Sequence, residues 1–229
     1  MLTGWCGTSP SAAQVVRPAD VEALRRELST AGPRGLIVRG LGRSYGDPAQ
    51  NAGGTVIDLT EWDAIIDVDL RAPTVRVQAG ISLDRLLRAL LPLGLWLPVV
   101  PGTRQVTVGG AIAADVHGKN HHVDGSFGNH LAQLDILLAS GDIVSATPDG
   151  DDAELFWATV GGMGLTGVVL EATIQLKEVE SSYFLVDTQR ARNLAELLAA
   201  LAQNDDAYTY SVAWFDTATT GDSLGSVQR

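Results

Sequence analysis

The stretch LIVRGLGRSYGD, residues 36–47, passes from a short apolar run into a loop that is rich in glycine. Glycine lets the backbone adopt conformations in which consecutive N–H groups converge on an anion, and Arg43 and Ser44 add side-chain donors beside them. The three glycines of the loop are Gly40, Gly42 and Gly46. The stretch therefore predicts a loop that binds a phosphate or diphosphate group.

This loop does not match the common nucleotide-binding motifs. Its third glycine comes one residue too late for the pattern G-x-G-x-x-G, and the next residues, DPAQNAGG, form a turn-rich segment where a Rossmann helix would begin. The pattern G-x-x-x-x-G-K-[ST] of a nucleotide-triphosphate loop does not occur in the sequence. We therefore expect an anion site of another architecture.

A β-α-β pattern surrounds the loop. An apolar pair at 15–16 is followed by a helix over 21–28, which begins near Asp20, and by a strand at 36–38. Further elements are expected downstream: strands at 55–60, 74–80 and 168–176, a helix capped by Ser82 over 82–91, a hairpin at 131–148 that turns at Gly141–Asp142, and a helix over 151–159.

The composition changes after Glu180, where a helix is expected over 193–203 and an alternating strand over 207–216. Alternation of this kind is typical of a core strand, and one face would carry Tyr208, Tyr210, Val212 and Trp214. One helix and one strand are too few for an independent core. We therefore predict a first domain over 1–178, with subdomains of about 1–58 and 59–178, and the incomplete start of a second domain over 179–229.

Charge and cysteine content restrict the function. The chain has 229 residues and a formal net charge of −11 at pH 7, so it should repel nucleic-acid phosphates. Cys6 is the single cysteine, which excludes an intrachain disulfide and a cysteine-rich metal site. No secretory signal is visible, and the apolar stretch 89–100 is too short and broken to span a bilayer. We expect a soluble protein, or one with peripheral membrane contact on the cytoplasmic or periplasmic face.

Two further glycine loops follow the first. PGTRQVTVGG covers residues 101–110, and VGGMGLTG covers residues 160–167. Each loop flanks an expected strand, so all three together suggest one elongated ligand whose diphosphate, sugar and ring are held by backbone groups. Taken one at a time, the same glycines could be ordinary turn residues.

The three loops carry a family resemblance. RGLGRSYGD resembles the pyrophosphate loop of the vanillyl-alcohol-oxidase-type, or PCMH-type, FAD-binding family. Residues 90–118 look like the stretch that wraps the flavin in that family, and residues 153–176 are similar to its closing motif. The resemblance implies an α+β fold, in which a PCMH-type FAD-binding domain of two α/β subdomains precedes a substrate or cap domain, and a flavoenzyme that acts on CH–OH groups.

The residues that the resemblance assigns to FAD lie in or beside the three loops. They are Arg39, Gly40, Leu41, Gly42, Arg43, Ser44, Tyr45, Gly46, Gly102, Thr107, Val108, Gly109, Gly110, Ala114, Asp115, Val116, His117, Gly167 and Val169.

The flavin is expected to be non-covalent. Many members of the family attach FAD through a histidine of the first loop, and the resemblance places Arg43 at that position. Arginine cannot form the bond. Cys6 lies far from the second loop, where the cysteinyl linkage of the family occurs.

The segments HGKNHH, GSFGNH and YTYSVAWFD narrow the resemblance to a branch that oxidises polyprenyl-phosphoryl ribose. It implies that the 2′-hydroxyl of decaprenylphosphoryl-β-D-ribose is oxidised to a 2′-keto sugar, the first half of an epimerisation that supplies arabinose for cell-wall arabinan. An NADH-dependent keto-reductase would be the partner. A sugar-lactone or alditol oxidase of the same fold is the alternative. We also expect this chain to bind FAD but to need a further segment for a complete active site.

All four histidines lie between residues 109 and 130. The resemblance places His117 near the flavin as the active-site histidine, with Lys119 facing the anionic part of the substrate and with Tyr45 and Trp214 lining the substrate pocket. His121, His122 and His130 are expected to anchor loops. A metal site at His117 and His121, with Asp115 or Asp124 as third ligand, is disfavoured because Gly118 and Asn120 make a poor helix. A non-enzymatic metal- or ligand-binding module remains a further alternative.

Overall fold

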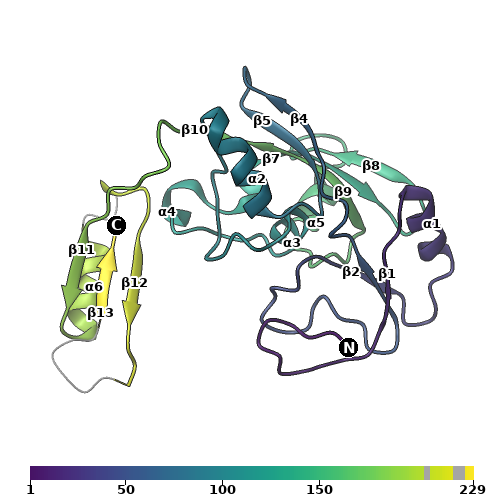
Figure 1. Ribbon diagram of the computed structural model, residues 1–229, viewed down its shortest axis with the longest axis horizontal. Helices are drawn as coiled ribbons and strands as arrows, with labels where there is room; N and C mark the ends of the chain where they lie inside the picture. The colour runs from purple at the N-terminus through teal and green to yellow at the C-terminus, as the bar shows by residue number, and fades with distance from the viewer. Residues whose placement is uncertain (204–206, 219–224) are drawn as a thin grey trace.

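The computed structural model describes residues 1–203, 207–218 and 225–229. Figure 1 shows a large N-terminal part, which contains β1 to β10, and a small C-terminal unit, which contains β11 to β13 and α6. Residues 179–187 connect the two without a helix or strand. The arrangement mixes helices with mainly separate sheets, which confirms the predicted α+β class.

The first sheet is parallel and has the strand order β1-β3-β2. Its strands are β1 (Gln14–Val16), β2 (Leu36–Arg39) and β3 (Thr55–Asp58). Helix α1 (Val21–Ser29) connects β1 to β2, and the Asp20 side chain caps it by accepting a hydrogen bond from the Ala23 N–H at 2.7 Å. The predicted β-α-β unit is therefore confirmed, and the glycine loop leaves the C-terminal end of β2.

The second sheet is antiparallel, with the strand order β4-β5-β9-β7-β8. Strands β7 and β8 form the predicted hairpin, and Gly141 turns it with a φ of 91°, a conformation that suits glycine. The five strands are β4 (Ile65–Asp69), β5 (Thr74–Gln78), β7 (Leu131–Leu137), β8 (Ile143–Ala146) and β9 (Val168–Gln175). Strand β4 was not expected from the sequence.

The remaining elements of the N-terminal part are short. Ser82 caps α2, as predicted, by accepting from the Arg85 N–H at 3.1 Å. The elements are α2 (Leu83–Leu90), the 3-10 helix η1 (Leu91–Leu93), β6 (Leu95–Trp96), α3 (Val108–Ala113), α4 (His121–Asp124), the 3-10 helix η2 (Phe127–His130), α5 (Ala153–Thr159) and β10 (Lys177–Glu178), which pairs with β6.

One sequence expectation fails in this region and another is confirmed. Residues 108–113, expected as loop, form α3, because Thr107 caps the helix and its apolar residues Val108, Ala111 and Ile112 are buried. The prediction that Gly118 and Asn120 make a poor helix is confirmed, because both lie outside the single turn α4, which begins at His121 and is followed by Gly125 with a φ of 71°. Tertiary burial outweighs weak helix propensity in α3.

The N-terminal part has two apolar clusters. The larger lies between the antiparallel sheet and the helices α2, α3 and α5, and includes Leu86, Ile112 and Phe156. The smaller joins the parallel sheet to the ends of β7 and β9, through Leu137 and Leu170 among others. The two predicted subdomains thus share buried contacts. Within the described residues, no helix has both the length and the hydropathy needed to cross a membrane.

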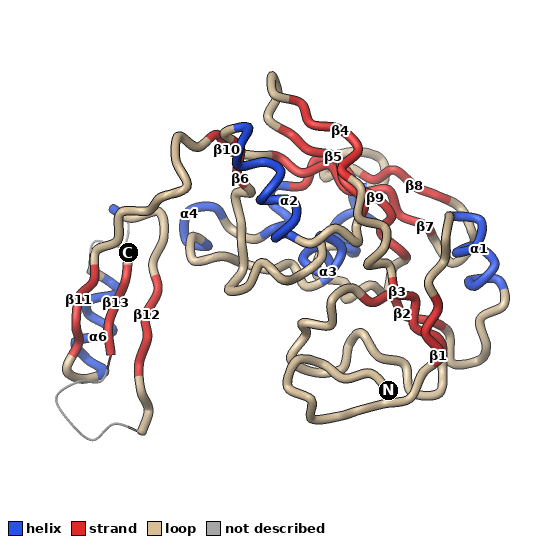
Figure 2. Tube along the Cα trace, in the orientation of Figure 1, coloured by secondary structure: helices blue, strands red, loops and turns tan. Residues whose placement is uncertain are grey.

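In its described residues, the C-terminal unit has a three-stranded antiparallel sheet, in the order β11-β13-β12, and the helix α6. Its elements are β11 (Thr188–Ala191), α6 (Leu194–Ala202), β12 (Val212–Phe215) and β13 (Gly225–Gln228), and Figure 2 shows them apart from the other sheets. The strand expected over 207–216 was too long, because Tyr208 and Tyr210 precede β12. Trp214 is 66% exposed, so the expectation of a core strand was also wrong. The domain boundary at 178 stays a prediction.

Asp58, the last residue of β3, has a pKa below its ordinary value. Burial of the carboxyl would raise that pKa, but hydrogen bonds from the Thr60 hydroxyl at 2.6 Å, the Thr60 N–H and Arg17 outweigh it. A carboxyl of this kind stabilises the fold above its unfolded pKa and loses that contribution as the pH falls through the folded value. We predict that Asp58→Asn lowers the free energy of unfolding by about 1–2 kcal/mol near neutral pH.

Urea unfolding of the wild type and Asp58→Asn across the acid range checks this, and the difference should shrink below about pH 4. Glu61→Gln is the matched control, since Glu61 is an exposed partner of the same Arg17 at 3.8 Å and should contribute far less. Equal losses in both variants, or a difference that does not change with pH, would contradict the prediction.

Candidate functional site

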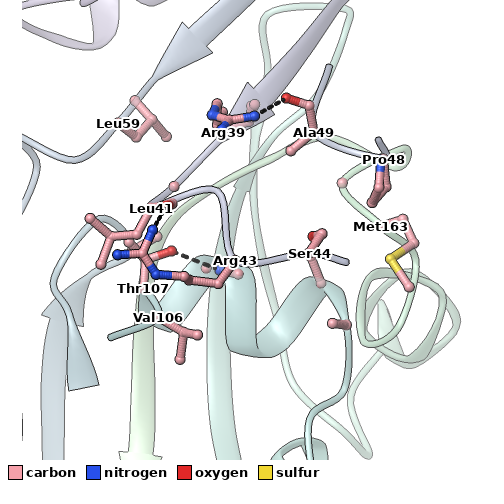
Figure 3. Close-up of a pocket in the computed structure, with 18 of the residues that line it drawn as sticks. Arg39, Leu41, Arg43, Ser44, Pro48, Ala49, Leu59, Val106, Thr107 and Met163 are labelled. Carbon is pink, nitrogen blue, oxygen red and sulfur yellow. Dashed lines mark hydrogen bonds between the residues drawn. The ribbon is translucent and has the colours of Figure 1, made fainter. Parts of the chain in front are cut away.

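One cavity lies where the three glycine loops meet. Its walls come from the end of β2 and the loop after it, from the segment that includes α3, and from the loop between α5 and β9. Figure 3 shows residues of all three segments around this cavity. The sequence-predicted residues that line it are Arg39, Gly40, Leu41, Gly42, Arg43, Ser44, Tyr45, Thr107, Gly109, Gly110, Ala114, Val116, Gly167 and Val169.

The first loop lines this cavity and has unpaired backbone donors. Among the described residues, the N–H groups of Leu41 to Tyr45 donate to no protein acceptor. The Arg43 guanidinium instead donates to the Leu41 carbonyl at 2.6 Å, which holds the side chain against its own loop (Figure 3). Consecutive free N–H groups in a glycine-rich turn form a site for an anion or for ordered water.

Glycine is required where the first loop contacts the second. A Cβ at Gly40 would overlap the Thr107 side chain, and that side chain is buried and caps α3 through a 3.1 Å bond from the Gly110 N–H. At Gly42 the φ is 66°, and a Cβ would overlap the Arg39 guanidinium. Glycine at position 40 therefore allows the first loop to lie against the start of α3, and glycine at position 42 allows the turn of the loop.

The third loop is fixed to α3 by backbone hydrogen bonds. The Gly161 N–H donates to the Ile112 carbonyl and the Met163 N–H donates to the Ala113 carbonyl, each at 2.9 Å. Met163 has a φ of 53°, a left-handed conformation that is uncommon for a residue with a side chain, and it lines the cavity. The loop is therefore held in a defined and locally strained shape at the cavity wall.

The charged side chains of the described lining are the guanidinium groups of Arg39 and Arg43, and no carboxylate belongs to it. Burial lowers the pKa of Arg39, a nearby Asp58 opposes that shift, and Arg43 adds to it. Arg39 donates to the Ala49 carbonyl at 3.1 Å and to the Thr3 carbonyl at 2.7 Å. The local charge therefore suits an anion, although the whole chain is acidic.

Several predicted residues do not line the cavity. Asp115, with a φ of 40°, accepts a hydrogen bond from the Gly128 N–H at 2.9 Å, and Gly102 has open space around it. Val108, the first residue of α3, points into the larger apolar cluster and is buried. Residues outside the lining are Gly46, Gly102, Val108, Asp115, His117, Lys119 and Trp214. Their assignment to cofactor or substrate stays a prediction.

The histidines have different neighbours. His122 donates from Nε2 to the Tyr208 carbonyl at 3.0 Å, and His130 donates from Nε2 to the Asp124 carbonyl at 2.8 Å. The rings of His117 and His121 are exposed and lie 5.3 Å apart edge to face. In the part of the chain that the structure describes, no three His, Cys, Asp or Glu side chains are grouped as a metal site.

The C-terminal unit contacts the segment that carries His117 and Lys119. The Ser211 N–H donates to the Lys119 carbonyl at 2.9 Å, and Lys177 donates to the Tyr210 hydroxyl at 2.7 Å. These bonds, with that of His122 to the Tyr208 carbonyl, tie the chain just before β12 to the segment around α4. Trp214 itself lies three residues beyond Ser211 on an exposed face.

Sequence reasoning missed a number of lining residues. Gly80 is the clearest case, because a Cβ there would overlap the Leu59 carbonyl, a contact between distant parts of the chain. The glycine directly after an alternating strand was its only sequence signal. The missed residues are Val38, Pro48, Ala49, Leu59, Ala79, Gly80, Ala113 and Thr159, whereas Val106, Met163 and Gly164 lie within the predicted glycine loops but were not assigned individually.

A family model and several curated relatives all point to flavoproteins. A family model described as an FAD binding domain matches residues 12–147. The chain is 51% identical over 228 residues to decaprenylphosphoryl-beta-D-ribose oxidase of Mycolicibacterium smegmatis, a match that covers 98% of this chain and 50% of that protein. It is 28% identical over 178 residues to alditol oxidase of a Streptomyces species, covering 77% of this chain and 42% of that protein.

A putative D-arabinono-1,4-lactone oxidase of Neurospora crassa is 29% identical over 174 residues, covering 75% of this chain and 31% of that protein. The chain therefore spans half or less of the length of these relatives. The family match covers the first and second glycine loops, the whole parallel sheet and the antiparallel sheet except β9. This chain belongs to the FAD-binding-domain family of flavoproteins and has its PCMH-type α+β fold.

Proposed function

We propose that the protein containing this chain oxidises the 2′-hydroxyl of decaprenylphosphoryl-β-D-ribose to the 2′-keto sugar with FAD. The observation that carries the proposal is the 51% identity, over 98% of this chain, to an oxidase of that name. Since the chain spans half of that relative, substrate and activity are inferred for the whole protein. A keto-reductase that uses NADH would then complete the epimerisation, and the polyprenyl group implies peripheral membrane contact.

The cavity fits FAD. Its unpaired N–H groups from Leu41 to Tyr45 and the Arg43 guanidinium suit the diphosphate, and its remaining wall is made largely of glycine and small apolar residues that allow close backbone approach. We assign the diphosphate to the first loop and the rest of the cofactor to the second and third loops. Arg43 stands where a covalent histidine linkage would form, so the flavin is non-covalent.

When bound, FAD supplies the oxidising chemistry by accepting the hydride from the carbinol carbon. The protein must take the hydroxyl proton. His117 Nδ1 lies 3.3 Å from the Gly118 carbonyl, to which it can only donate, so its Nε2 is left as the proton acceptor. His117 is therefore the proposed general base.

Lys119 is assigned to the substrate phosphodiester. Its side chain is exposed, two residues from His117, while its backbone carbonyl is held by Ser211. An ammonium group suits a phosphodiester as a point charge. Tyr45, on the first loop, and Trp214, on β12, are assigned to the walls around the sugar.

The second candidate is a sugar-lactone or alditol oxidase, because relatives of both kinds share the fold at 28–29% identity. Their substrates lack a phosphodiester, so Lys119 separates the two proposals. We predict that Lys119→Met in the full-length protein raises the Kd of a short-chain polyprenyl-phosphoryl ribose about tenfold, since one charge-assisted contact is lost. Lys119→Arg should retain most of the affinity.

Anaerobic titration of the flavin absorbance with the phosphoryl sugar, an alditol and a sugar lactone measures this. Bleaching by the phosphoryl sugar alone supports the proposal. Bleaching by the neutral sugars, equally strong in wild type and Lys119→Met, would favour the alternative.

A second prediction compares two glycines that the sequence could not distinguish. Gly40→Ala should weaken FAD binding about tenfold or more, because the new Cβ overlaps the buried Thr107 side chain and displaces the first loop. Gly102→Ala meets open space and has no left-handed φ, so FAD affinity should stay at the wild-type value. Flavin fluorescence titration measures both, and equal effects would contradict the assigned cavity.

A further inference from the structure

Residues 2–7, here called the strap, lie against the first glycine loop but outside the family match, which begins at residue 12. A pair of backbone hydrogen bonds between Leu2 and Ser11, at 2.8 and 2.9 Å, closes the strap into its own loop. Figure 1 shows the N-terminus beside the loops that follow β2, far from it in sequence. The strap therefore lies outside the residues that the family model matches, yet it packs on the loop that the family model includes.

Backbone contacts hold the strap on the loop. The Trp5 N–H donates to the Ser44 carbonyl at 2.7 Å, and the Thr3 carbonyl accepts from the Arg39 guanidinium at 2.7 Å. A Cβ at Gly4 would overlap the Gly46 carbonyl and lie 2.8 Å from the Ser44 carbonyl. Since both are backbone atoms that cannot rotate away, only glycine allows this approach.

Gln50, which follows the first loop, contacts the strap through its side chain. With its amide nitrogen turned toward the strap, Gln50 donates to the Leu2 carbonyl at 2.9 Å, and its oxygen accepts from the Gly4 N–H at 3.2 Å. The strap thus contacts the loop at its beginning, its middle and its end.

The strap also contacts the cationic side chain of the site. The Arg43 guanidinium carbon lies 5.1 Å from the centre of the Trp5 ring, a cation–π contact, although Trp5 is 62% exposed. This contact restrains the position of the Arg43 guanidinium.

We propose that the strap is a positioning element for FAD, in which Trp5 and Gly4 hold the first loop and Arg43 in the diphosphate-binding arrangement. The proposal rests on the assignment of that loop to the FAD diphosphate. The Thr3 carbonyl accepts from the Arg39 guanidinium, and the Gly4 carbonyl accepts from the Gly7 N–H. Neither carbonyl pairs with the N–H groups of the first loop from Leu41 to Tyr45, which are left for the ligand. A loop ordered before binding loses less conformational entropy when the ligand arrives, so affinity rises without a direct contact.

The test measures FAD affinity by flavin fluorescence and, in the FAD-free chain, the rate of trypsin cleavage after Arg43. Trp5→Ala should weaken FAD binding about two- to fivefold, the range of an exposed cation–π contact, and should speed cleavage. Trp5→Phe should restore much of both, because it keeps an aromatic ring. Gly4→Val should have a larger effect than Trp5→Ala. Thr8→Ala, an exposed neighbour, is the control and should match the wild type.

A double-mutant cycle separates positioning from general stability. If Trp5 acts through Arg43, Trp5→Ala should have no further effect on FAD affinity in an Arg43→Ala background. Wild-type affinity and cleavage in both Trp5→Ala and Gly4→Val would overturn the proposal, as would fully additive effects in the cycle. If the wild type failed to bind FAD, the cofactor assignment would fall, while the cleavage rates would still decide whether the strap orders the loop.

Discussion

The architecture of the site depends on a run of backbone N–H groups that the described protein leaves without acceptors. In the loop from Leu41 to Tyr45 these donors must be met by water or by a ligand, because unpaired N–H groups are costly away from solvent. The surrounding glycines are consequences of the same requirement. Gly40 allows the loop to lie against the cap of α3, and Gly42 allows its turn. An acidic protein can hold an anion here because the local donors, and not its net charge, set the local field.

Local patterns made the frame of the fold predictable. The β-α-β unit, the Ser82 cap and the hairpin at Gly141 all depend on residues close in sequence, so periodicity and turn chemistry were sufficient. Helix α3 was missed because two adjacent glycines disfavour a helix, and only burial beneath the loops shows why it forms. The wall residue Gly80 was missed for the same kind of reason, since its small size matters only beside the Leu59 carbonyl.

The three loops that form the site were predicted from the sequence, but which of their residues line the cavity was not. Glycine spacing and family resemblance identified most of the lining, whereas they could not show that Gly102 faces open space or that Asp115 bonds to the Gly128 N–H. Backbone conformation decides both, and sequence alone does not give it. The C-terminal unit illustrates the limit most clearly. Alternation indicated a core strand, yet Trp214 lies exposed, and it is the Ser211 backbone that contacts the segment carrying Lys119.

The central claim is that this chain holds FAD, without a covalent bond, in the cavity between the three loops. A visible absorption spectrum of the purified chain, after addition of FAD and removal of the excess, followed by acid precipitation, tests it most directly. The account predicts a flavin spectrum that passes into the supernatant with the acid. Colour that stays with the precipitated protein would contradict the non-covalent assignment and the interpretation of Arg43. A chain that retains no flavin would contradict the assignment of the cavity itself.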